Sequence, residues 1–289
     1  KVGKFIVATE LEEVAYLQQL FQRAKANGIA SVELISQNLL RKQEPNVKAI
    51  EALWVPSTGI IDSHKLMESL ESEAKSNGCD FAYRHEVIGI EKIPDGYRIL
   101  LRTADGETFN VQSKFVINSA GLESDTIAKL LGMDIDALGY RLLWAKGHYF
   151  RVKPAKSKLV NHLIYPVPPK EENFLGIHLT LELDGGLKLG PDIVFLGERK
   201  QDYSVPEKLL EKFYLSVSRY LDGLEPEDLI PDQAGIRPKL ATSLGNFPDF
   251  IIKEESGNGF PGLVNLIGIE SPGLTCCLEI GRLALEKIG

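Results

Sequence analysis

The sequence predicts a mixed α/β and α+β protein with two domains whose segments alternate along the chain. Its 289 residues are 44% hydrophobic and 25% charged, an ordinary globular composition with enough chain to bury one or two cores. Strands followed by turns and helices occupy residues 1–138 and 246–289. Within residues 139–245, longer strands with aromatic residues are expected at 144–152, 174–183 and 193–196, a pattern typical of a large antiparallel sheet.

The first segment, residues 4–58, begins with a strand from Phe5 to Ala8. Thr9 and Glu12 have the spacing of a capping box, and apolar residues at helical spacing predict a helix from Glu10 to Asn27. Three shorter elements are expected next: a strand at 31–35, a helix at 37–43 that ends before Pro45, and a strand at 52–55.

Residues 59–138 predict a second helix and a three-stranded meander. Asp62 caps this helix, which ends at Asn77-Gly78, and a strand is expected directly afterwards at residues 80–83. Asp-Gly turns separate the meander strands, which are expected at residues 87–93, 97–102 and 108–111. A strand at 115–118 then leads through Ser119-Ala-Gly121 into a helix that ends at Leu131.

The last part of the chain predicts one helix from Pro206 to Leu221 and a hairpin at Gly257-Asn-Gly259. A strand from Asn265 then passes through a Gly/Pro turn into an amphipathic helix that reaches Ile288. Such a turn presents unpaired N–H groups and the positive end of a helix dipole, which suits an anion or an electron-rich oxygen. The same pattern also occurs in α/β proteins without a ligand there.

Charge and cysteine content exclude several classes of function. The net charge of −7 and the pI near 5.4 argue against nucleic acid as a partner, and an anionic substrate would need a local basic pocket. Cys79, Cys276 and Cys277 have neither the number nor the spacing of a disulfide framework or a metal site. We therefore predict a cytoplasmic protein, with peripheral membrane association left open. No apolar run reaches the roughly 18 residues of a membrane span.

Four groups of short segments give the chain a family resemblance. In chain order they are Asn118-Ser-Ala-Gly-Leu-Glu-Ser-Asp125, Phe174-Leu-Gly-Ile-His-Leu-Thr180 with Asp184-Gly-Gly186 and Leu189-Gly-Pro191, Ala234-Gly-Ile-Arg-Pro238, and Gly268-Ile-Glu-Ser-Pro-Gly-Leu-Thr275. With these segments in the family's order, the chain resembles the D-amino-acid-oxidase-like FAD-dependent oxidoreductases over residues 4–288. Within them it is most similar to L-2-hydroxyglutarate dehydrogenase/oxidase and its relatives.

Two departures from the family pattern stand out. The Gly-x-Gly-x-x-Gly turn that holds the FAD pyrophosphate in such proteins is absent, so a βαβ unit of about 30 residues is expected to lie outside this sequence. The sequence Asn265-Leu-Ile-Gly-Ile-Glu-Ser-Pro272 replaces the His-containing Asn-Ala-Pro-Ser-Pro-type sequence of the better-known 2-hydroxyglutarate enzymes. It places Glu270 near the expected flavin, where a carboxylate would be repelled unless it points away.

The resemblance implies a two-domain flavoprotein. Residues 59–138 and 246–289 would form an N-terminally truncated FAD domain of the glutathione-reductase type, and residues 4–58 and 139–245 an antiparallel-sheet substrate domain. The Val87 backbone would meet the adenine, and the Ala120-Gly121 turn the ADP portion. The remaining cofactor-binding residues would be those of the final turn: Gly268, Ser271, Pro272, Gly273, Leu274 and Thr275.

Arg237 is the first candidate for substrate binding. Pro238 removes the next N–H, Gly235 allows close backbone approach, and a guanidinium holds a carboxylate through two parallel hydrogen bonds. In the resembled family the matching arginine faces the substrate carboxylate. A structural arginine paired with Asp232 or Asp249 is the alternative.

His178 is the candidate base. In a strand it shares one face with Gly176 and Thr180, and imidazole has a pKa suited to removing a hydroxyl proton, although a lone strand histidine is often only hydrogen-bonded. The match to the family's Leu-Gly-x-His-x-Thr favours the catalytic interpretation. Secondary candidates near the flavin are Tyr165, His148 and Tyr149, which could equally be sheet aromatics. No histidine has metal-ligand spacing, and no Gly-x-Ser-x-Gly elbow supports a hydrolase.

The resemblance therefore predicts an FAD-dependent dehydrogenase or oxidase that acts on a small anionic 2-hydroxy acid similar to L-2-hydroxyglutarate, with an unknown electron acceptor. Two alternatives stay open. Relatives of the same architecture oxidise amines such as glycine, sarcosine or proline. The chain could also be a folded remnant that does not hold FAD, because the pyrophosphate-binding turn is absent.

Overall fold

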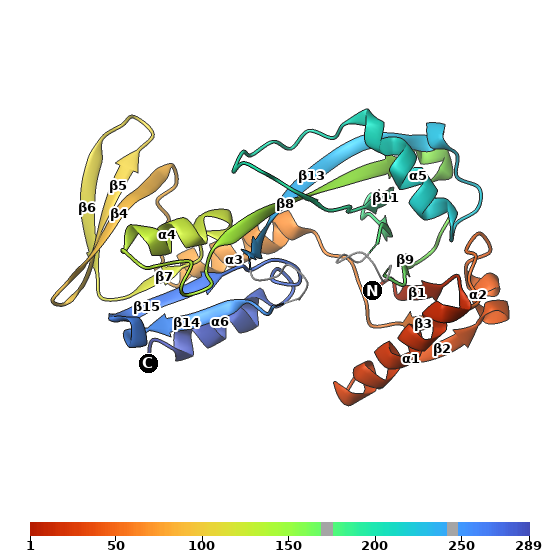
Figure 1. The fold of residues 1–289 in the computed structure, drawn as a ribbon, viewed down its shortest axis with the longest axis horizontal. Helices are drawn as coiled ribbons and strands as arrows, with labels where there is room; N and C mark the ends of the chain where they lie inside the picture. Colours follow the sequence, from red (N-terminus) through yellow and green to blue (C-terminus); the bar gives the residue numbers. More distant parts are fainter. Residues whose placement is uncertain (169–175, 242–247) are drawn as a thin grey trace. The chain divides into compact units, whose positions relative to one another are not determined.

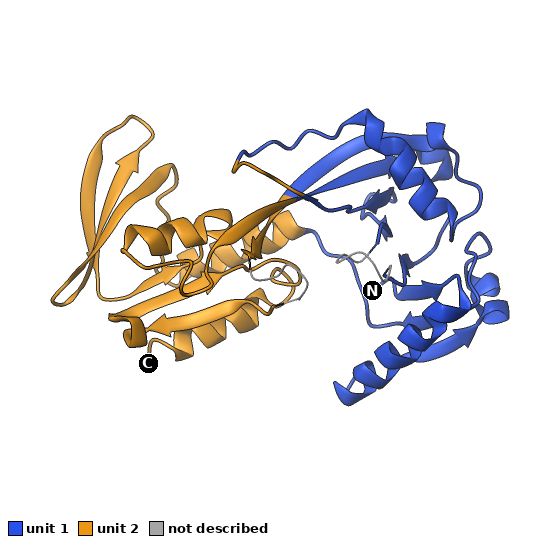
Figure 2. Ribbon diagram, viewed as in Figure 1, with its two compact units in different colours: residues 1–62, 146–194, 200–235 blue, residues 63–145, 195–199, 236–289 orange. Residues whose placement is uncertain are grey.

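A computed structural model describes residues 1–168, 176–241 and 248–289. The chain forms two compact units, each assembled from separate stretches (Figure 2). Unit 1 comprises residues 1–62, 146–194 and 200–235, and unit 2 comprises residues 63–145, 195–199 and 236–289. The assignment of substrate binding to one unit and FAD binding to the other stays a prediction.

A large sheet dominates unit 1 (Figure 1). Within the described residues it has nine strands in the order β12-β8-β11-β10-β9-β1-β3-β2, with β13 paired to β8. The pairings of β1 with β3, β2 with β3, β9 with β10, β10 with β11 and β11 with β8 are antiparallel, and β1 pairs in parallel with β9. Much of the sheet is thus antiparallel, as predicted. Its strands are β1 (Lys4–Ala8), β2 (Glu33–Ser36), β3 (Glu51–Val55), β8 (Leu142–Val152), β9 (Leu163–Pro166), β10 (His178–Leu181), β11 (Leu187–Gly190), β12 (Val194–Phe195) and β13 (Leu229–Leu240). Its helices are α1 (Leu11–Ala26), α2 (Gln37–Gln43) and α5 (Leu210–Ser218).

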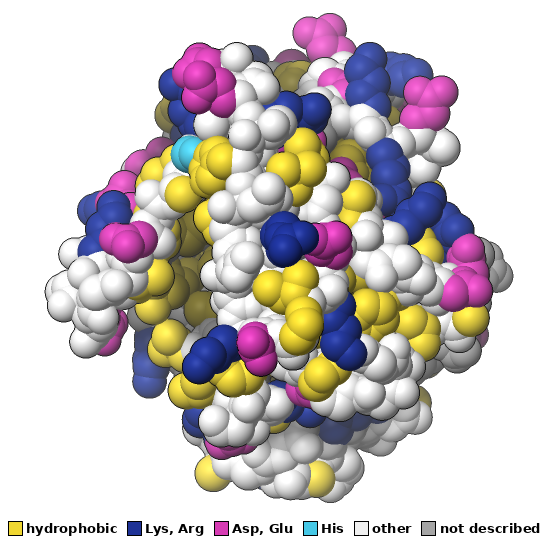
Figure 3. All heavy atoms as spheres, turned by 90° about the vertical axis from the view of Figure 1, so that its left-hand side faces the viewer, with side chains coloured by type: hydrophobic (Ala, Val, Ile, Leu, Met, Phe, Trp, Pro, Cys, Tyr) yellow, Lys and Arg dark blue, Asp and Glu magenta, His cyan; other side chains and the backbone are white. Residues whose placement is uncertain are grey.

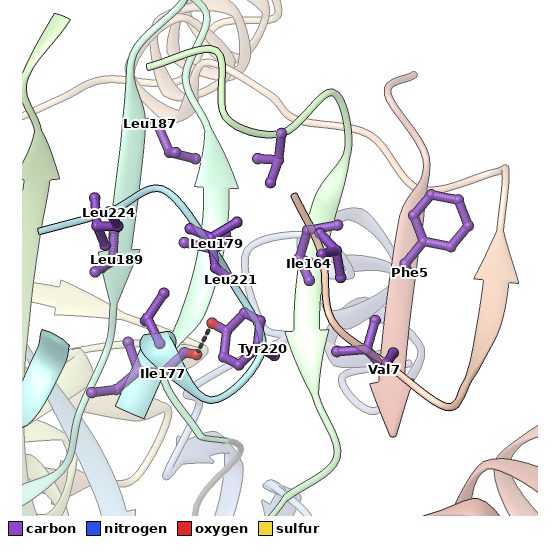
Figure 4. Packing of buried hydrophobic residues seen from close by; sticks show 14 of the residues in the cluster. Phe5, Val7, Ile164, Ile177, Leu179, Leu187, Leu189, Tyr220, Leu221 and Leu224 are labelled. Carbon is purple, nitrogen blue, oxygen red and sulfur yellow. Dashed lines mark hydrogen bonds between the residues drawn. The ribbon is translucent and has the colours of Figure 1, made fainter. Parts of the chain in front are cut away.

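The main core of unit 1 is formed by inward-facing residues of this sheet together with helix α5 (Figure 4). Ile164, Ile177 and Leu179 are at most 2% exposed, and the Tyr220 hydroxyl donates a hydrogen bond of 2.7 Å to the Ile177 carbonyl. A buried tyrosine hydroxyl needs such a partner, so this bond fixes the start of strand β10 against the core. The opposite side chain in the alternation, His178, is thereby directed to the other face of the sheet.

Unit 2 holds two three-stranded sheets. One is the meander of β4 (His85–Ile93), β5 (Gly96–Thr103) and β6 (Thr108–Ser113), as the Asp-Gly turns predict. The other has the order β14-β15-β7, formed by β14 (Ile251–Glu255), β15 (Phe260–Ile267) and β7 (Val116–Asn118), with the predicted hairpin between β14 and β15. The helices of this unit are α3 (Ser63–Ser76), α4 (Ser124–Leu130) and α6 (Cys277–Glu286).

Three local predictions need correction. The cap of α1 lies one residue later, because the Glu13 carboxylate accepts hydrogen bonds from the Thr9 and Glu10 backbone N–H groups at 2.7 and 3.3 Å. Residues 80–83 form no strand and pair with no strand of the described residues; Phe81 and Tyr83 are 39% and 61% exposed. The strand predicted at 174–183 is observed at His178–Leu181, while 174 and 175 lie outside the described residues.

The helix predicted from Pro206 to Leu221 begins as a 3-10 turn at Glu207–Leu209 and continues as α5, which ends at Ser218.

Across the described stretches, no helix combines the length and the apolar character needed to cross a bilayer. Figure 3 shows one face on which exposed hydrophobic side chains lie among charged side chains of both signs.

Candidate active site

His178 and Tyr165 lie next to each other on adjacent strands of unit 1. Strands β9 and β10 run antiparallel with Leu179 opposite Ile164, so the next pair along the register is His178 and Tyr165. Their rings stack with centroids 3.7 Å apart and an interplanar angle of 10°. His178 is 6% exposed, and its neighbour Leu179 points into the core (Figure 4). The predicted alternation is thus confirmed, and the structure adds an aromatic partner that fixes the plane of the imidazole.

Lys4 completes this group, and sequence reasoning missed it. Its Nζ atom lies 4.8 Å from the centroid of the Tyr165 ring, a cation–π distance. In the parallel pairing of β1 with β9, Lys4 lies opposite Leu163 and Ile6 lies opposite Tyr165. Lys4 is two residues before Ile6 on β1, so it faces the same side of the sheet as Ile6. Burial lowers the pKa of Lys4 and raises the pKa of Tyr165, to which the Tyr149 phenol also contributes. Tyr165 therefore keeps its proton at neutral pH and can donate a hydrogen bond.

His148, a secondary candidate, is held by a buried carboxylate. The Oδ1 atom of Asp192 accepts hydrogen bonds from the His148 backbone N–H at 2.9 Å and from Nδ1 at 2.8 Å. Lys212 donates to the Oδ2 atom at 3.1 Å, and Asp192 is fully buried. Burial alone would raise the pKa of Asp192, but these hydrogen bonds outweigh it and hold the pKa below its usual value. The contacts explain His148 as a firmly positioned sheet residue.

We expect Asp192→Asn to lower the free energy of unfolding by about 1 to 3 kcal/mol at neutral pH, because buried donors lose their charged acceptor. A lowered folded-state pKa stabilises the fold above the unfolded value, near 4, and that contribution is lost as the pH falls through the folded pKa. Urea unfolding at several pH values should show the difference from wild type shrinking on acidification. Asp184→Asn, which alters an exposed pair with Arg151, is the matched control and should cost less. A pH-independent difference would contradict the assignment.

Arg237 lies on β13, in the part of this strand (residues 236–240) that belongs to unit 2, and its observed partner differs from those expected. Its NH1 atom is 3.6 Å from the Oε2 atom of Glu270, while Asp232 pairs with Lys188 and Asp249 accepts a hydrogen bond from the Phe250 N–H. The Nε atom of Arg237 is buried without a hydrogen-bond partner among the described residues. A buried donor without a partner is costly, so this guanidinium has unused capacity for an anion.

Glu270 points toward two cations, Lys239 and Arg237. Lys239 Nζ donates a hydrogen bond of 2.7 Å to Glu270 Oε1, and the Lys239 side chain is only 10% exposed. Strand alternation places Arg237 and Lys239 on one face of β13, two residues apart. Sequence reasoning identified Arg237 but not Lys239, because the pairing depends on where the turn after β15 lies.

The two turns predicted to hold the cofactor lie at the same end of one sheet. Strands β7 and β15 are parallel, with Asn118 opposite Asn265, and the two side chains are hydrogen-bonded at 2.8 Å. The turns that follow them, at Ala120-Gly121 and at residues 268–275, therefore both leave from the carboxyl ends of parallel strands, where α/β sheets bind ligands. A Cβ added at Gly121 would meet no atom within 4 Å, so the backbone there is open to a ligand.

The final turn offers fewer free N–H groups than the sequence suggests. The N–H groups of Gly273, Thr275 and Cys276 donate to carbonyls within the turn, at 2.5, 2.9 and 3.2 Å. A Cβ at Gly273 would lie 2.5 Å from Ile269 Cγ2, so the turn is closed on itself. The small residues of the two turns fit a group that approaches the backbone closely. The start of α6 offers fewer free N–H groups to an anion than a helix whose first N–H groups are all unpaired.

The third predicted cofactor contact, Val87, lies on the meander strand β4, just before a register shift at Gly89.

Gly268 is a residue of the final turn whose substitution is expected to weaken folding. Its φ is +72°, and a Cβ there would lie 2.9 Å from Leu240 Cγ. We expect Gly268→Ala to lower the free energy of unfolding by about 1 to 3 kcal/mol, through backbone strain and overpacking. Gly281→Ala, inside α6 with no atom within 4 Å, should instead be neutral or stabilising. Equal urea midpoints for the two variants would show that Gly268 is not required for the turn.

Known proteins of one family are similar to this chain over nearly its whole length. The family model described as FAD dependent oxidoreductase matches residues 1–287. The chain is 33% identical to the mitochondrial L-2-hydroxyglutarate dehydrogenase of Arabidopsis thaliana and 29% identical to L-2-hydroxyglutarate dehydrogenase of Escherichia coli, each over 99% of this chain. It spans 66% of the plant protein and 72% of the bacterial one. The solved L-alpha-glycerophosphate oxidase from Mycoplasma pneumoniae with FAD bound has a TM-score of 0.87 at 25% identity, covering 100% of this chain and 73% of that one.

Proposed function

Since the chain belongs to the FAD dependent oxidoreductase family, we propose that the protein oxidises a small 2-hydroxy acid, L-2-hydroxyglutarate, to the 2-oxo acid. The observation that carries the proposal is the similarity to L-2-hydroxyglutarate dehydrogenases from a plant and a bacterium along 99% of this chain. Both relatives are named for oxidation of a hydroxy acid, which favours this reaction over oxidation of an amine. The names of these relatives do not identify an electron acceptor.

The two turns at the carboxyl ends of β7 and β15 support FAD as the cofactor. In the proposal, Ala120-Gly121 contacts the ADP portion, the Val87 backbone contacts the adenine, and the final turn contacts the flavin. The flavin residues are Gly268, Ser271, Pro272, Gly273, Leu274 and Thr275. When bound, FAD would accept the hydride that leaves the substrate α-carbon.

Three side chains of this protein have distinct roles in the proposed reaction. His178 removes the substrate hydroxyl proton on a ring nitrogen, since neutral imidazole is a base near pH 7. Tyr165 stacks on that ring at 3.7 Å and, because its pKa is raised, offers its hydroxyl as a hydrogen-bond donor. Arg237 binds a substrate carboxylate through its guanidinium. His178 and Tyr165 belong to unit 1 and Arg237 to unit 2.

A substrate screen of the purified full-length protein tests the proposal. A flavin absorption spectrum that is bleached by L-2-hydroxyglutarate, with dye reduction under turnover, is the expected result. The D-enantiomer, glycine, sarcosine and L-proline serve as comparisons of similar size. Turnover of an amine without turnover of any 2-hydroxy acid would favour the amine oxidase, and a colourless protein that takes up no added FAD would favour the remnant.

The cellular setting is part of the proposal as well. We propose a cytoplasmic location, supported by the three free thiols Cys79, Cys276 and Cys277. Fractionation of cells that express the full-length protein separates this from peripheral membrane association. Comparing oxygen, quinones and dyes as oxidants of the purified protein identifies the electron acceptor.

A further inference from the structure

The cluster of Arg237, Lys239 and Glu270 in unit 2 contains two cations and one carboxylate. Lys239 Nζ lies 2.7 Å from Glu270 Oε1, a short charged hydrogen bond. Arg237 NH1 lies 3.6 Å from Glu270 Oε2, which is an ion-pair distance beyond hydrogen-bond range. The Glu270 carboxylate therefore makes its closer contact with Lys239 and only a longer ion pair with Arg237.

This unequal sharing is chemically unexpected. A guanidinium is the better partner for a carboxylate, because it can form two parallel hydrogen bonds where an ammonium forms one. Both cations stand on the same face of β13, so Glu270 can reach either. The Glu270 backbone is fixed, because the Gly273 N–H donates a hydrogen bond of 2.5 Å to the Glu270 carbonyl. Only rotation of the Glu270 side chain can move its carboxylate from one cation to the other. Arg237 meanwhile retains a buried Nε without a hydrogen-bond partner in the described part of the chain.

We propose that Lys239 is a positioning residue that holds the Glu270 carboxylate to one side and so leaves Arg237 available for the carboxylate of the substrate. The inference rests on the proposed function, in which Arg237 binds that carboxylate. The Glu270 carboxylate then competes with the substrate carboxylate for Arg237, and its hydrogen bond to Lys239 weakens that competition. Without Lys239, the carboxylate would form the bidentate pair with Arg237 that the substrate needs.

The test compares Lys239→Met, Glu270→Gln and the double variant in the flavin-loaded full-length protein. Lys239→Met is expected to raise KM for L-2-hydroxyglutarate about tenfold or more, with a smaller change in kcat, because a fixed carboxylate then occupies Arg237. Adding Glu270→Gln should return KM to within about threefold of wild type, since an amide does not compete as an anion. Calorimetric titration with glutarate, an unreactive dicarboxylate, should show the same order of affinities.

Control variants separate this role from a merely structural one. Lys239→Arg keeps the charge and should keep KM near that of wild type. Lys75→Met removes a lysine from the exposed pair with Glu71 on α3 and should leave KM unchanged. Should Lys239→Met not fold, Glu270→Gln alone still decides, because the inference requires its KM to be equal to or below that of wild type.

The possible outcomes distinguish the inference from the proposed function. A raised KM in Lys239→Met that Glu270→Gln does not rescue, an unchanged KM in Lys239→Met, or a raised KM in Glu270→Gln alone overturns the role of Lys239. If the wild-type protein neither oxidises L-2-hydroxyglutarate nor binds glutarate, the proposed function fails and the inference fails with it.

Discussion

Replacing His178 with Asn is expected to lower kcat by about 10² to 10⁴, with a much smaller effect on KM. The proposed role of His178 is used only at the chemical step, when the hydroxyl proton leaves, so its loss destabilises the transition state and not the bound substrate. Asn has a similar size and can still form hydrogen bonds in the strand. Steady-state kinetics of the full-length protein, normalised to flavin content, measure the effect.

Two further measurements distinguish loss of the base from a general structural effect of replacing a packed histidine. With substrate deuterated at the α-carbon, the isotope effect on kcat should become larger or stay large in His178→Asn, because chemistry then limits turnover. His162→Asn is the matched control: His162 also packs against aromatic rings, those of Phe5 and Trp54, and pairs with the buried Glu44. It should lower thermal stability while leaving kcat per flavin unchanged. Near-normal kcat in His178→Asn would make His178 a sheet residue and move the search for the base to His148 or Tyr165.

Truncating Arg237 to Ala is expected to lower kcat/KM by about 10² to 10³, mainly through a higher KM. In the proposal the guanidinium holds the carboxylate in the ground state and the transition state alike, so binding suffers more than the chemical step. Arg237→Lys should recover only part of the loss, because an ammonium cannot form the bidentate pair. Flavin content should be the same in all three proteins.

A neutral substrate offers the sharpest control for Arg237. The dimethyl ester of L-2-hydroxyglutarate has lost both negative charges, so any turnover of the ester should be similar in wild type and Arg237→Ala. A variant that discriminates against the ester as strongly as wild type does would show that Arg237 does not read the carboxylate. Arg237 would then be explained by its pairing with Glu270 alone.

Local elements of the fold could be predicted closely because their signals are local. The helix at Gln37–Gln43 has the predicted bounds, and the three meander strands are separated at the predicted Asp-Gly turns. The strand predicted at residues 80–83 was wrong for a related reason: apolar composition says that a segment can pair, but not that a partner is near. Pairing partners are set by tertiary structure, so strand propensity by itself gave a false positive there.

The candidate site divides in the same way. Alternation along the strand placed Ile177 and Leu179 on the face opposite to His178. In the structure both side chains belong to the main core of unit 1. The alternation could not show that the Tyr165 ring stacks on His178, or that Lys4 lies over Tyr165. These contacts join three separate strands, of which β1 is remote in sequence from β9 and β10, and strand pairing is set by tertiary structure. The catalytic roles of His178, Tyr165 and Arg237 stay predictions.

The sequence by itself determined the class of the protein. The strand and helix periods predicted its mixed α/β organisation, and the short motifs in their order resembled the FAD-dependent oxidoreductases, a family membership that the family match confirms. Only the tertiary structure decided which charges meet. Lys239 and Glu270 lie 31 positions apart and form a hydrogen bond, and Asp192 reaches His148 across 44 positions. A periodic pattern reports which face a side chain shares with its near neighbours. Electrostatic contacts depend on distances through space, and these are fixed only when strands from remote segments pack together.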